Sequence, residues 1–419
     1  MTRALALIDG EHYAPVIRAA LEELPYDFVA AHLVGGTEKL RDDSDYGVVL
    51  ADDLDRALSE HRPELVVDLS DEPVLGPVAR FALASRVLAQ GVPYVGADFR
   101  LDPPVLNAFP LPSIAVVGTG KRVGKTAVTG HLARLLANDR RVVVVAMGRG
   151  GPSEPEVVSV PPTVDALLEL SRSGRHAASD HLETAALVGV ATVGCRRCGG
   201  GLAGGVATSN VADGARVAVE LGPDLVVFDG SGAALPPIDT DRTVAVVGGD
   251  QDPAVAAGYL NAYRLLRADL VVLTMAEPSV AWKEVQHAVR GIVRTGVDVI
   301  ATRLRPRPLV DVSGRSVAFF SAAPAGAHER LRAELEAASG ASVVHVSGNL
   351  ADRSALREEL SRVEADVFVV ELKAAAIDVV AEAAHARGVD VVLAANDVVP
   401  LDGEPDLDER LLEVAKFQK

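Results

Sequence analysis

The stretch Ile114-Ala-Val-Val-Gly118-Thr-Gly-Lys-Arg-Val-Gly124-Lys125-Thr126 decides the fold of this chain. Its first residues are apolar and predict a strand, its glycines predict a turn, and apolar residues then recur at helical spacing from Val128 to Leu136. Glycines let the backbone N–H groups of such a turn face a phosphate, and the positive end of the next helix adds to the attraction. The pattern predicts a P-loop; the alternative, an ordinary strand-to-helix turn, is disfavoured by the Gly-Lys-Thr sequence.

The polar residues of this loop have distinct expected roles. Lys125 is expected to contact the β- and γ-phosphates of ATP, and the Thr126 hydroxyl is expected to bind Mg²⁺. Gly118 lies one residue earlier than in the standard motif, so that Thr119 stands at the usual glycine position. The sequence therefore predicts ATP and Mg²⁺ as cofactors, with Lys121 and Lys125 as catalytic cations. The expected nucleotide-binding residues are Gly118, Thr119, Gly120, Lys121, Arg122, Val123, Gly124, Lys125 and Thr126.

The composition supports an α/β fold around this loop. Hydrophobic residues make up 49% of the chain and aromatic residues only 4%, so Ala, Val and Leu must fill the cores. The expected strands are short and almost continuously apolar, which is typical of parallel sheets buried on both faces. Such runs alternate with helical patterns, which predicts parallel sheets with right-handed crossovers. The clearest runs are Val142–Val145, Leu225–Phe228, Leu270–Leu273 and Val367–Val370.

Proline-rich segments divide the chain, whose 419 residues indicate more than one domain. Phe99–Pro112 contains four prolines and no periodicity, and Arg305-Pro-Arg-Pro308 interrupts the pattern again. We therefore expect an N-terminal α/β domain (residues 1–108), a P-loop ATP-binding catalytic domain (113–308) and a C-terminal α/β domain (312–419). The role of the C-terminal domain stays open.

The charge and the N-terminus narrow the class of partner. A formal net charge of −17 disfavours nucleic acid and anionic membranes, because like charges repel at long range. No apolar run approaches the length of a membrane span. The chain enters an expected strand at Ala4–Ile8 without a signal sequence. We therefore expect a cytoplasmic protein with a small-molecule substrate and no nucleic-acid or membrane partner; a homodimer is one alternative for its oligomeric state.

A second apolar strand ends in a carboxylate. Asp224-Leu-Val-Val-Phe-Asp229 is followed by Gly-Ser-Gly232. P-loop enzymes hold Mg²⁺ near the β/γ-phosphates with a carboxylate at such a strand end. Asp229 is therefore the expected metal residue beside Thr126, and a strand-end cap is the alternative.

Three loops expected at strand ends carry arginines. Arg149 lies in Met147–Glu156, Arg196 and Arg197 lie in Thr192–Gly205 among six glycines, and a third loop covers Thr302–Arg307. Ligands of open α/β sheets bind at the carboxyl ends of strands. Arginine forks suit phosphates and carboxylates, and glycines let the backbone approach an anion. Arg149, Arg196 and Arg197 are thus expected to hold a small anionic substrate; solvated basic loops are the alternative.

The Gly-x5-Gly-Lys-Thr spacing resembles dethiobiotin synthetase and its relatives, which phosphorylate an acid and then close a ring. The Asp229-Gly-Ser-Gly segment is similar to the acid-Gly-Ala-Gly of that family. Thr302-Arg303 aligns with a base-binding Asn-Arg of the same superfamily, which implies that both residues bind nucleotide; Thr in place of Asn leaves base selectivity open. Relatives that act as partitioning switches carry a signature lysine where this chain has Gly120, which counts against a nucleotide switch.

A more specific resemblance, to cyclic 2,3-diphosphoglycerate synthetase, covers most of the chain. It implies an ATP-dependent ligase that cyclises 2,3-diphosphoglycerate and releases ADP and phosphate. The alternatives are another ATP-dependent ligase or kinase of the dethiobiotin synthetase type and, less favoured, a non-enzymatic switch. The similar stretches are Leu7–Tyr13, Gly118–Thr126, Met147–Pro152, Gly194–Gly199, Asp229–Pro237 and Asp250–Pro253.

Two further groups leave alternatives open. Cys195 and Cys198 are too few for a disulfide framework. They are expected to be thiols that line the anion loop, a regulatory disulfide, or metal ligands with His176 and His181 nearby. Glu11 and His12, after the first strand, are expected either to contact substrate as acid and base or to form a helix start.

Overall fold

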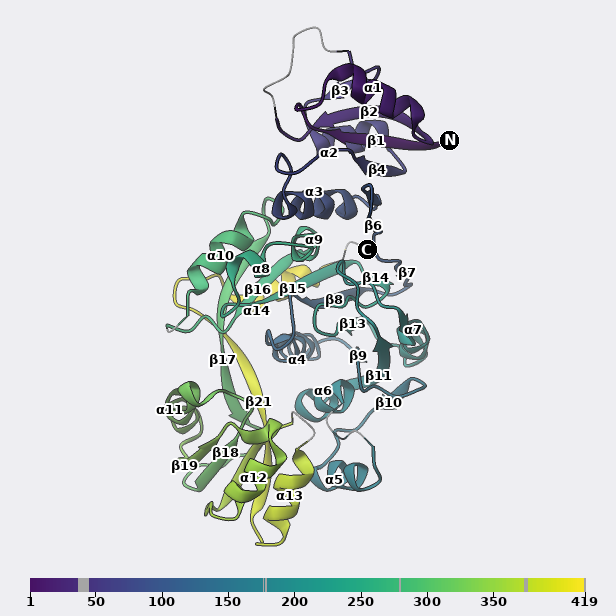
Figure 1. The fold of residues 1–419 in the computed structure, drawn as a ribbon. Coiled ribbons are helices and arrows are strands. Elements are labelled where there is room, and N and C mark those ends of the chain that lie inside the picture. The colour runs from purple at the N-terminus through teal and green to yellow at the C-terminus, as the bar shows by residue number, and fades with distance from the viewer. Residues whose placement is uncertain (37–44, 176, 178, 279, 373–375, 418–419) are drawn as a thin grey trace.

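The computed structural model describes residues 1–36, 45–175, 177, 179–278, 280–372 and 376–417. Three α/β domains follow one another along the molecule, with the N-terminal domain at the top of Figure 1 and the C-terminal domain at the bottom. The N-terminal domain has a six-stranded sheet in the order β3-β2-β1-β4-β5-β6. Its elements are β1 (Thr2–Ile8), α1 (Ala14–Glu23), β2 (Tyr26–Leu33), β3 (Leu50–Ala51), α2 (Leu54–His61), β4 (Leu65–Asp68), α3 (Pro77–Ala89), β5 (Tyr94–Val95) and β6 (Arg100–Leu101).

The proline-rich segment after this domain is anchored at both ends. Its β6 pairs antiparallel with β5 of the N-terminal sheet. Its second short strand, β7 (Asn107–Ala108), pairs with β14 (Ile238–Asp239) of the next domain. Helix α3 adds a further contact, because the Ser85 hydroxyl donates to the Tyr259 carbonyl at 3.1 Å and the rings of Phe81 and Tyr259 meet edge to face. The segment therefore holds the two domains together.

The central domain is built around β8 (Ser113–Gly118), the strand that leads into the P-loop. β8 lies between β13 (Leu225–Asp229) and β15 (Arg242–Gly248), and both neighbours run parallel to it. The carboxyl ends of all three strands therefore meet at one edge of the sheet. The other strands are β9 (Val142–Gly148), β10 (Glu156–Val158), β11 (Ala191–Cys198), β12 (Thr208–Ser209), β16 (Leu270–Thr274) and β17 (Asp298–Pro308).

Helices cover both faces of this sheet, and the apolar strand residues between them are buried. This matches the continuous apolar runs, since a strand covered on both faces has no solvent side. The helices are α4 (Lys125–Leu136), α5 (Val164–Arg172), α6 (Asp180–Val188), α7 (Val211–Glu220), α8 (Pro253–Ala256), α9 (Asn261–Leu266) and α10 (Trp282–Arg290).

The C-terminal domain continues the same sheet. β17 pairs antiparallel with β21 (Asp390–Pro400), and the sheet extends through β20 (Val367–Glu371) and β18 (Ser316–Phe320) to β19 (Ser342–Ser347). A single thirteen-stranded sheet therefore runs through both domains, and in Figure 1 β17 and β21 form the long connection between them. The helical elements are η1 (Ala325–Ala327), α11 (His328–Ser339), η2 (Asn349–Ala351), α12 (Arg353–Leu360) and α13 (Ile377–His385).

The last helix returns to the central domain. Helix α14 (Leu407–Val414) packs on α4, where Leu407, Leu411 and Ala415 join the core that contains Leu132 and Leu136. Two polar contacts support this packing: His131 Nε2 lies 2.6 Å from Asp408 Oδ1, and Arg140 donates to the Ala415 carbonyl. The expected third domain of residues 312–419 thus includes a helix that covers the P-loop helix.

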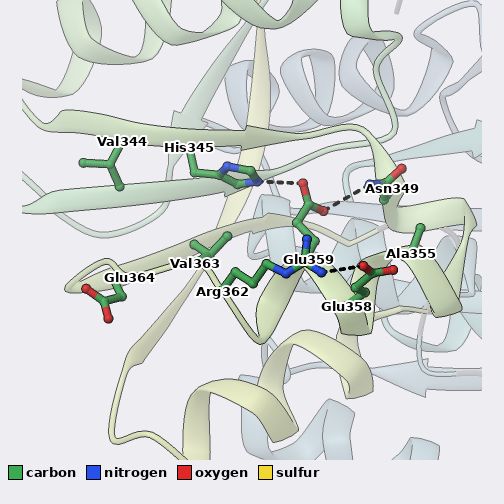
Figure 2. Close-up of a pocket in the computed structure, with 9 residues that line it drawn as sticks. All are labelled: Val344, His345, Asn349, Ala355, Glu358, Glu359, Arg362, Val363 and Glu364. Carbon is green, nitrogen blue, oxygen red and sulfur yellow. Dashed lines mark hydrogen bonds and ion pairs between the residues drawn. The ribbon is translucent and has the colours of Figure 1, made fainter.

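A cavity of about 560 Å³ opens in the C-terminal domain (Figure 2). His345 Nε2 lies 2.7 Å from Glu359 Oε1, and Asn349 donates to the other oxygen of Glu359. The one arginine of the lining, Arg362, is paired with Glu358 at 2.6 Å. The cavity therefore lacks the unpaired cations that a polyanion needs.

Among the described residues, no helix has both the length and the apolar character that a membrane crossing requires.

Candidate nucleotide and anion site

The P-loop turn forms between Gly118 and Gly124. Arg122 and Gly124 have φ angles of 64° and 79°, in the left-handed region, and α4 begins at Lys125. Gly118 is required by close approach, because a Cβ atom there would lie 2.9 Å from the Gly232 carbonyl. The early glycine of the motif is therefore the point where the segment after β13 meets the P-loop.

Lys125 and Asp229 are paired with each other. The Lys125 ammonium donates to Oδ1 of Asp229 at 2.5 Å, and the Thr129 hydroxyl donates to the same oxygen at 2.7 Å. The Asp229 side chain is 1% exposed. Asp229 lies at the end of β13, adjacent to β8, so the parallel register brings the two expected residues together across the sheet.

The donors at this point suit Mg²⁺, which prefers oxygen ligands and retains several waters. Asp229 Oδ2 accepts no hydrogen bond from any described residue, and the half-buried Thr126 lies in the first turn of α4. No group of three or more His, Cys, Asp or Glu side chains that could hold a metal occurs within the described part of the chain. Thr126 and Asp229 would therefore hold Mg²⁺ together with phosphate and water oxygens.

Arg197 lies beside the same loop. Its guanidinium donates to the Ser231 carbonyl at 2.9 Å and to the Gly199 carbonyl at 2.9 Å. Burial, followed by the nearby charge of Arg149, lowers the pKa of Arg197 below its ordinary value. The structure thus brings Arg149 and Arg197 close together near Ser231, two residues after Asp229.

The expected loop Thr192–Gly205 is partly a strand. β11 extends through Cys198 and pairs with β9 as far as Arg196, so Arg196 and Arg197 occupy a strand end and not a loop. Successive side chains of a strand point to opposite faces. The two arginine side chains therefore lie on opposite faces of the strand, and the expectation of a loop at Arg196 and Arg197 is wrong. Arg197 is held by carbonyls, whereas the Arg196 side chain is exposed and contacts no hydrogen-bond or ion-pair partner among the described residues.

Four exposed cations lie in the P-loop or at the carboxyl ends of β9 and β11, on the same edge of the sheet, without partners of their own. Most arginines elsewhere are bound to carboxylates or carbonyls, but these side chains make no hydrogen bond or ion pair within the described chain. Unpaired cations in a protein with a net charge of −17 favour a polyanionic ligand at this edge of the sheet. They are Lys121, Arg122, Arg149 and Arg196.

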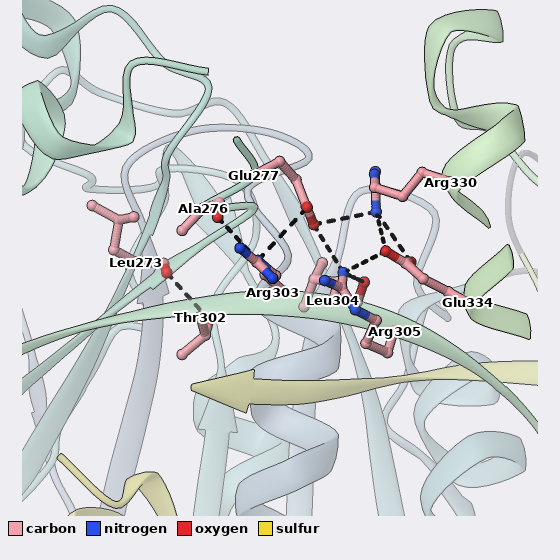
Figure 3. A network of polar contacts seen from close by, with 9 residues as sticks. All are labelled: Leu273, Ala276, Glu277, Thr302, Arg303, Leu304, Arg305, Arg330 and Glu334. Atoms are coloured by element: carbon pink, nitrogen blue, oxygen red, sulfur yellow. Dashed lines mark hydrogen bonds and ion pairs between the residues drawn. The ribbon is translucent and has the colours of Figure 1, made fainter. Parts of the chain in front are cut away.

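Thr302 and Arg303 are already engaged (Figure 3). Thr302 is fully buried, and its hydroxyl donates to the Leu273 carbonyl at 3.2 Å. Arg303 donates to the Ala276 carbonyl and lies 3.8 Å from Glu277 Oε2. In this arrangement Thr302 supports the sheet and offers no group to a base.

Glu277 joins the central domain to the C-terminal one in the same network. Its Oε1 lies 2.9 Å from Arg305 Nη1 and 3.2 Å from Arg330 Nη1, and Arg330 belongs to α11. Glu334 of the same helix binds both arginines. The expected third basic loop is therefore the continuation of β17 and an ion-pair network between domains.

The two cysteines are separate thiols. Cys195 is buried against α7, where a Cβ atom on Gly214 would collide with its sulfur, and Cys198 is exposed. Three residues along a strand span about 10 Å, which exceeds the reach of a disulfide. Burial raises the pKa of Cys195 to about 12. The disulfide alternative therefore fails. His176, named in the metal alternative, lies outside the described residues, and a Cβ atom on Gly194 would collide with the ring of His181.

The N-terminal motif forms a closed network at the end of β1. Asp9 is fully buried; its Oδ1 lies 2.8 Å from His12 Nδ1, and its Oδ2 accepts the Asp71 N–H. Burial alone would raise the pKa of Asp9, but the hydrogen bonds from Asp71 and His12 outweigh it and lower that pKa. His12 is thus held by acids of its own domain.

Sequence reasoning missed two residues that shape the site. Gln251, after β15, accepts a hydrogen bond from Thr119 of the P-loop at 2.6 Å. Arg264, on α9, is 2% exposed and donates to the carbonyls of Ala233 and Leu202, which lie in the two glycine-rich segments beside the P-loop. Burial lowers the pKa of Arg264 to about 10. A lone arginine in the apolar run Ala262–Leu266 was the available signal for the second residue.

Family models match almost the whole chain. The P-loop domain of cyclic 2,3-diphosphoglycerate synthetase matches residues 113–302, its N-terminal domain matches residues 3–102, and its C-terminal domain matches residues 308–397. This chain belongs to the cyclic 2,3-diphosphoglycerate synthetase family. The expected family resemblance and the α/β fold with a central P-loop domain are thereby confirmed.

Curated relatives cover the chain from end to end. The protein of that name from Rubrobacter xylanophilus is 51% identical over 96% of both chains. The one from Thermococcus kodakarensis is 42% identical over 98% of both, and the one from Methanothermus fervidus is 39% identical over 99% of this chain and 97% of its own. A crystal structure of LpxK from Aquifex aeolicus in complex with ATP matches with a TM-score of 0.43 and 16% identity, over 74% of this chain and 91% of that one. So low a similarity says nothing about ligands.

Proposed function

We propose that this protein is a cytoplasmic ATP-dependent ligase that cyclises 2,3-diphosphoglycerate and releases ADP and phosphate. The full-length relatives carry the name of that synthetase. The observation that carries the proposal is the set of unpaired cations in the P-loop and at the carboxyl ends of β9 and β11, on the sheet edge where the P-loop lysine is paired with Asp229. A substrate with two phosphates and a carboxylate needs such concentrated positive charge in an otherwise acidic protein.

The residues of the chain supply positioning and charge. Lys125 contacts the terminal phosphates of ATP after it leaves Asp229, and the backbone N–H groups at the start of α4 hold the β-phosphate. Arg149 and Arg196 neutralise the substrate, and Arg197 fixes Ser231 and Gly199 around it. Thr126 and Asp229 would hold Mg²⁺, which would supply neutralisation of the phosphate charge.

The proposed chemistry balances in two steps. An oxygen of one substrate phosphate attacks the γ-phosphorus of ATP, the bond to ADP breaks, and a diphosphate forms on the substrate. An oxygen of the second substrate phosphate then attacks the phosphorus that is bonded to the substrate. The new phosphoanhydride closes the ring, and inorganic phosphate leaves. Holding two anions together is the main barrier, so proximity and preorganised cations provide the rate enhancement.

The test is substrate-dependent turnover by the purified protein. Adding 2,3-diphosphoglycerate with Mg²⁺ and ATP should release ADP and phosphate in equal amounts, and phosphorus NMR should show a cyclic product with anhydride resonances. ADP release with a linear phosphorylated product would indicate a kinase. ADP release that depends on another acid but not on 2,3-diphosphoglycerate would favour a ligase of the dethiobiotin synthetase type.

A further inference from the structure

Gln251 connects the strand end of β15 with the first half of the P-loop. Its Oε1 accepts two hydrogen bonds, from the Thr119 hydroxyl at 2.6 Å and from the Gly248 N–H at 3.0 Å. Thr119 is 4% exposed, and its own N–H donates to the Val246 carbonyl. The beginning of the P-loop is therefore fixed to β15 by the backbone hydrogen bond to Val246 and, through Oε1 of Gln251, to the end of that strand.

These two bonds determine which way the amide faces. A backbone N–H can only donate, so the atom that accepts from Gly248 must be the oxygen and not the nitrogen. Nε2 then points to the opposite side, toward Gly120, where a Cβ atom would lie 3.1 Å from it. Nε2 makes no hydrogen bond with any residue that the structure describes, and the side chain is half-buried. An amide donor is thus held in place over the P-loop.

We propose that Gln251 donates from Nε2 to an oxygen of the terminal phosphoryl group of the bound nucleotide, while its Oε1 positions Thr119. This inference rests on the proposed use of ATP. The helix start at Lys125 holds the β-phosphate, so the opposite end of the loop, at Gly120, faces the next phosphoryl group outward. A neutral donor fixed before binding stabilises charge that shifts during transfer without the cost of reorganisation.

Gln251→Glu is the sharpest test, because it retains an oxygen for Thr119 and Gly248 and replaces the donor with a negatively charged oxygen. Titration calorimetry with Mg²⁺ would compare ADP with the β,γ-imido analogue of ATP. We expect affinity for the analogue to fall about tenfold or more and affinity for ADP to change little. We also expect kcat to fall on the order of a hundredfold, as for other lost preorganised donors.

Two further variants separate the loss of the donor from the added charge and from the contact with Thr119, and one control tests the same chemical change elsewhere. Gln251→Met removes the donor without adding charge and should show a smaller loss that is still confined to the analogue. Thr119→Val removes the contact at Oε1 and should impair the same nucleotide. Gln90→Glu, an exposed glutamine in the N-terminal domain, makes the same chemical change and should alter neither affinity. Melting curves would show that each variant is folded.

Equal losses for ADP and the analogue would overturn the inference, because they would show that Gln251 only supports the loop. Unchanged binding of both nucleotides by a folded Gln251→Glu protein would also overturn it. The binding measurements need no second substrate. If 2,3-diphosphoglycerate elicits no turnover from the unmodified protein, the proposed function fails while the comparison of nucleotides still decides the role of Gln251.

Discussion

Lys125 donates to Asp229 across the boundary between α4 and β13, so the cation proposed to bind phosphate and the anion proposed to bind Mg²⁺ neutralise each other. A bound phosphate would compete with Asp229 for the positive charge of Lys125, and two anions that share one ammonium also repel each other. The pair therefore opposes the binding of metal-free nucleotide and favours nucleotide that arrives with a cation for Asp229.

Asp229→Asn should reverse this preference. Without Mg²⁺, ADP should bind the variant about tenfold more tightly than the unmodified protein, because Lys125 is free and a negative charge has gone. Addition of Mg²⁺ should strengthen binding to the unmodified protein and have little effect on the variant. Calorimetry with and without EDTA measures both. Asp224→Asn, at the start of the same strand, is the control, and an undiminished Mg²⁺ effect in Asp229→Asn would assign the metal to another residue.

Lys125→Ala should abolish turnover while the protein remains folded, since the lysine charge acts on the transferred phosphoryl group. The melting temperature should still fall, because Asp229 is left buried with Thr129 as its remaining partner. Release of ADP measures turnover, and thermal melting followed by circular dichroism measures the melting temperature. Lys416→Ala, an exposed lysine outside the site, should leave both unchanged; near-normal ATP consumption by Lys125→Ala would refute the P-loop assignment.

Alanine variants of Arg196 and Arg197 should show the same kinetic defect, but only one of them should lower the stability of the protein. Arg196→Ala and Arg197→Ala should each raise the KM for the anionic substrate about tenfold or more, with a much smaller change for ATP. Only Arg197→Ala should also lower the melting temperature, because Arg197 holds the carbonyls of Ser231 and Gly199. Lysine substitutions should rescue incompletely. Arg357→Ala, an exposed arginine of α12, is the control; equal losses for ATP and substrate would place these residues at the nucleotide.

The thiols should react very differently. At pH 8, iodoacetamide should label the exposed Cys198 and leave Cys195 unmodified until the protein unfolds, as mass spectrometry of peptides would show. Burial raises the pKa of Cys195 from 9.0 to about 12, so the folded state keeps this thiol protonated while the unfolded chain ionises. Its contribution to stability is therefore present below pH 9 and is lost as pH rises toward 12. Fast labelling of native Cys195 would contradict the burial.

Leu411→Ala tests the packing of α14 on the P-loop helix. Leu411 is fully buried, so truncation should cost about 2–5 kcal/mol of unfolding free energy. Saturating ADP with Mg²⁺ should restore part of the lost melting temperature, because a ligand of the native state stabilises it by mass action. Leu50→Ala, at a side chain that is 38% exposed, should cost much less. A melting temperature equal to that of the Leu50 variant would show that α14 does not stabilise α4.

Local patterns predicted the parts of the fold that depend on neighbours in sequence. The apolar run before Gly118 became β8, and the run that ends at Asp229 became β13, because a strand buried on both faces needs apolar residues throughout. The positions of Lys125 and Asp229 followed from these strands, because one residue lies just after β8 and the other at the end of β13. Their meeting could be anticipated from the rule that parallel strands end at one edge of a sheet.

Parts of the site that depend on distant partners could not be predicted in the same way. Glycines around Arg197 indicated a loop, but pairing with β9 as far as Arg196 and with β12 at Arg197 and Cys198 extends the strand through Cys198. The Thr302 hydroxyl is used by the Leu273 carbonyl of the adjacent strand, which no pattern near residue 302 reveals. Gln251 lies in Asp250–Pro253, one of the stretches that carry the family resemblance, but only the folded sheet brings it to Thr119. Tertiary contacts decide each of these positions.

The return of α14 to the central domain has a consequence for synthesis on the ribosome. The C-terminal α/β unit lies between β17 and α14 in the chain, so it is translated before the nucleotide-binding domain receives its last helix. Domains generally fold as they emerge, and α14 emerges only after the whole C-terminal α/β unit. The side of α4 that packs against α14 therefore stays uncovered until α14 has emerged, so the P-loop domain is completed only after the C-terminal α/β unit has been made.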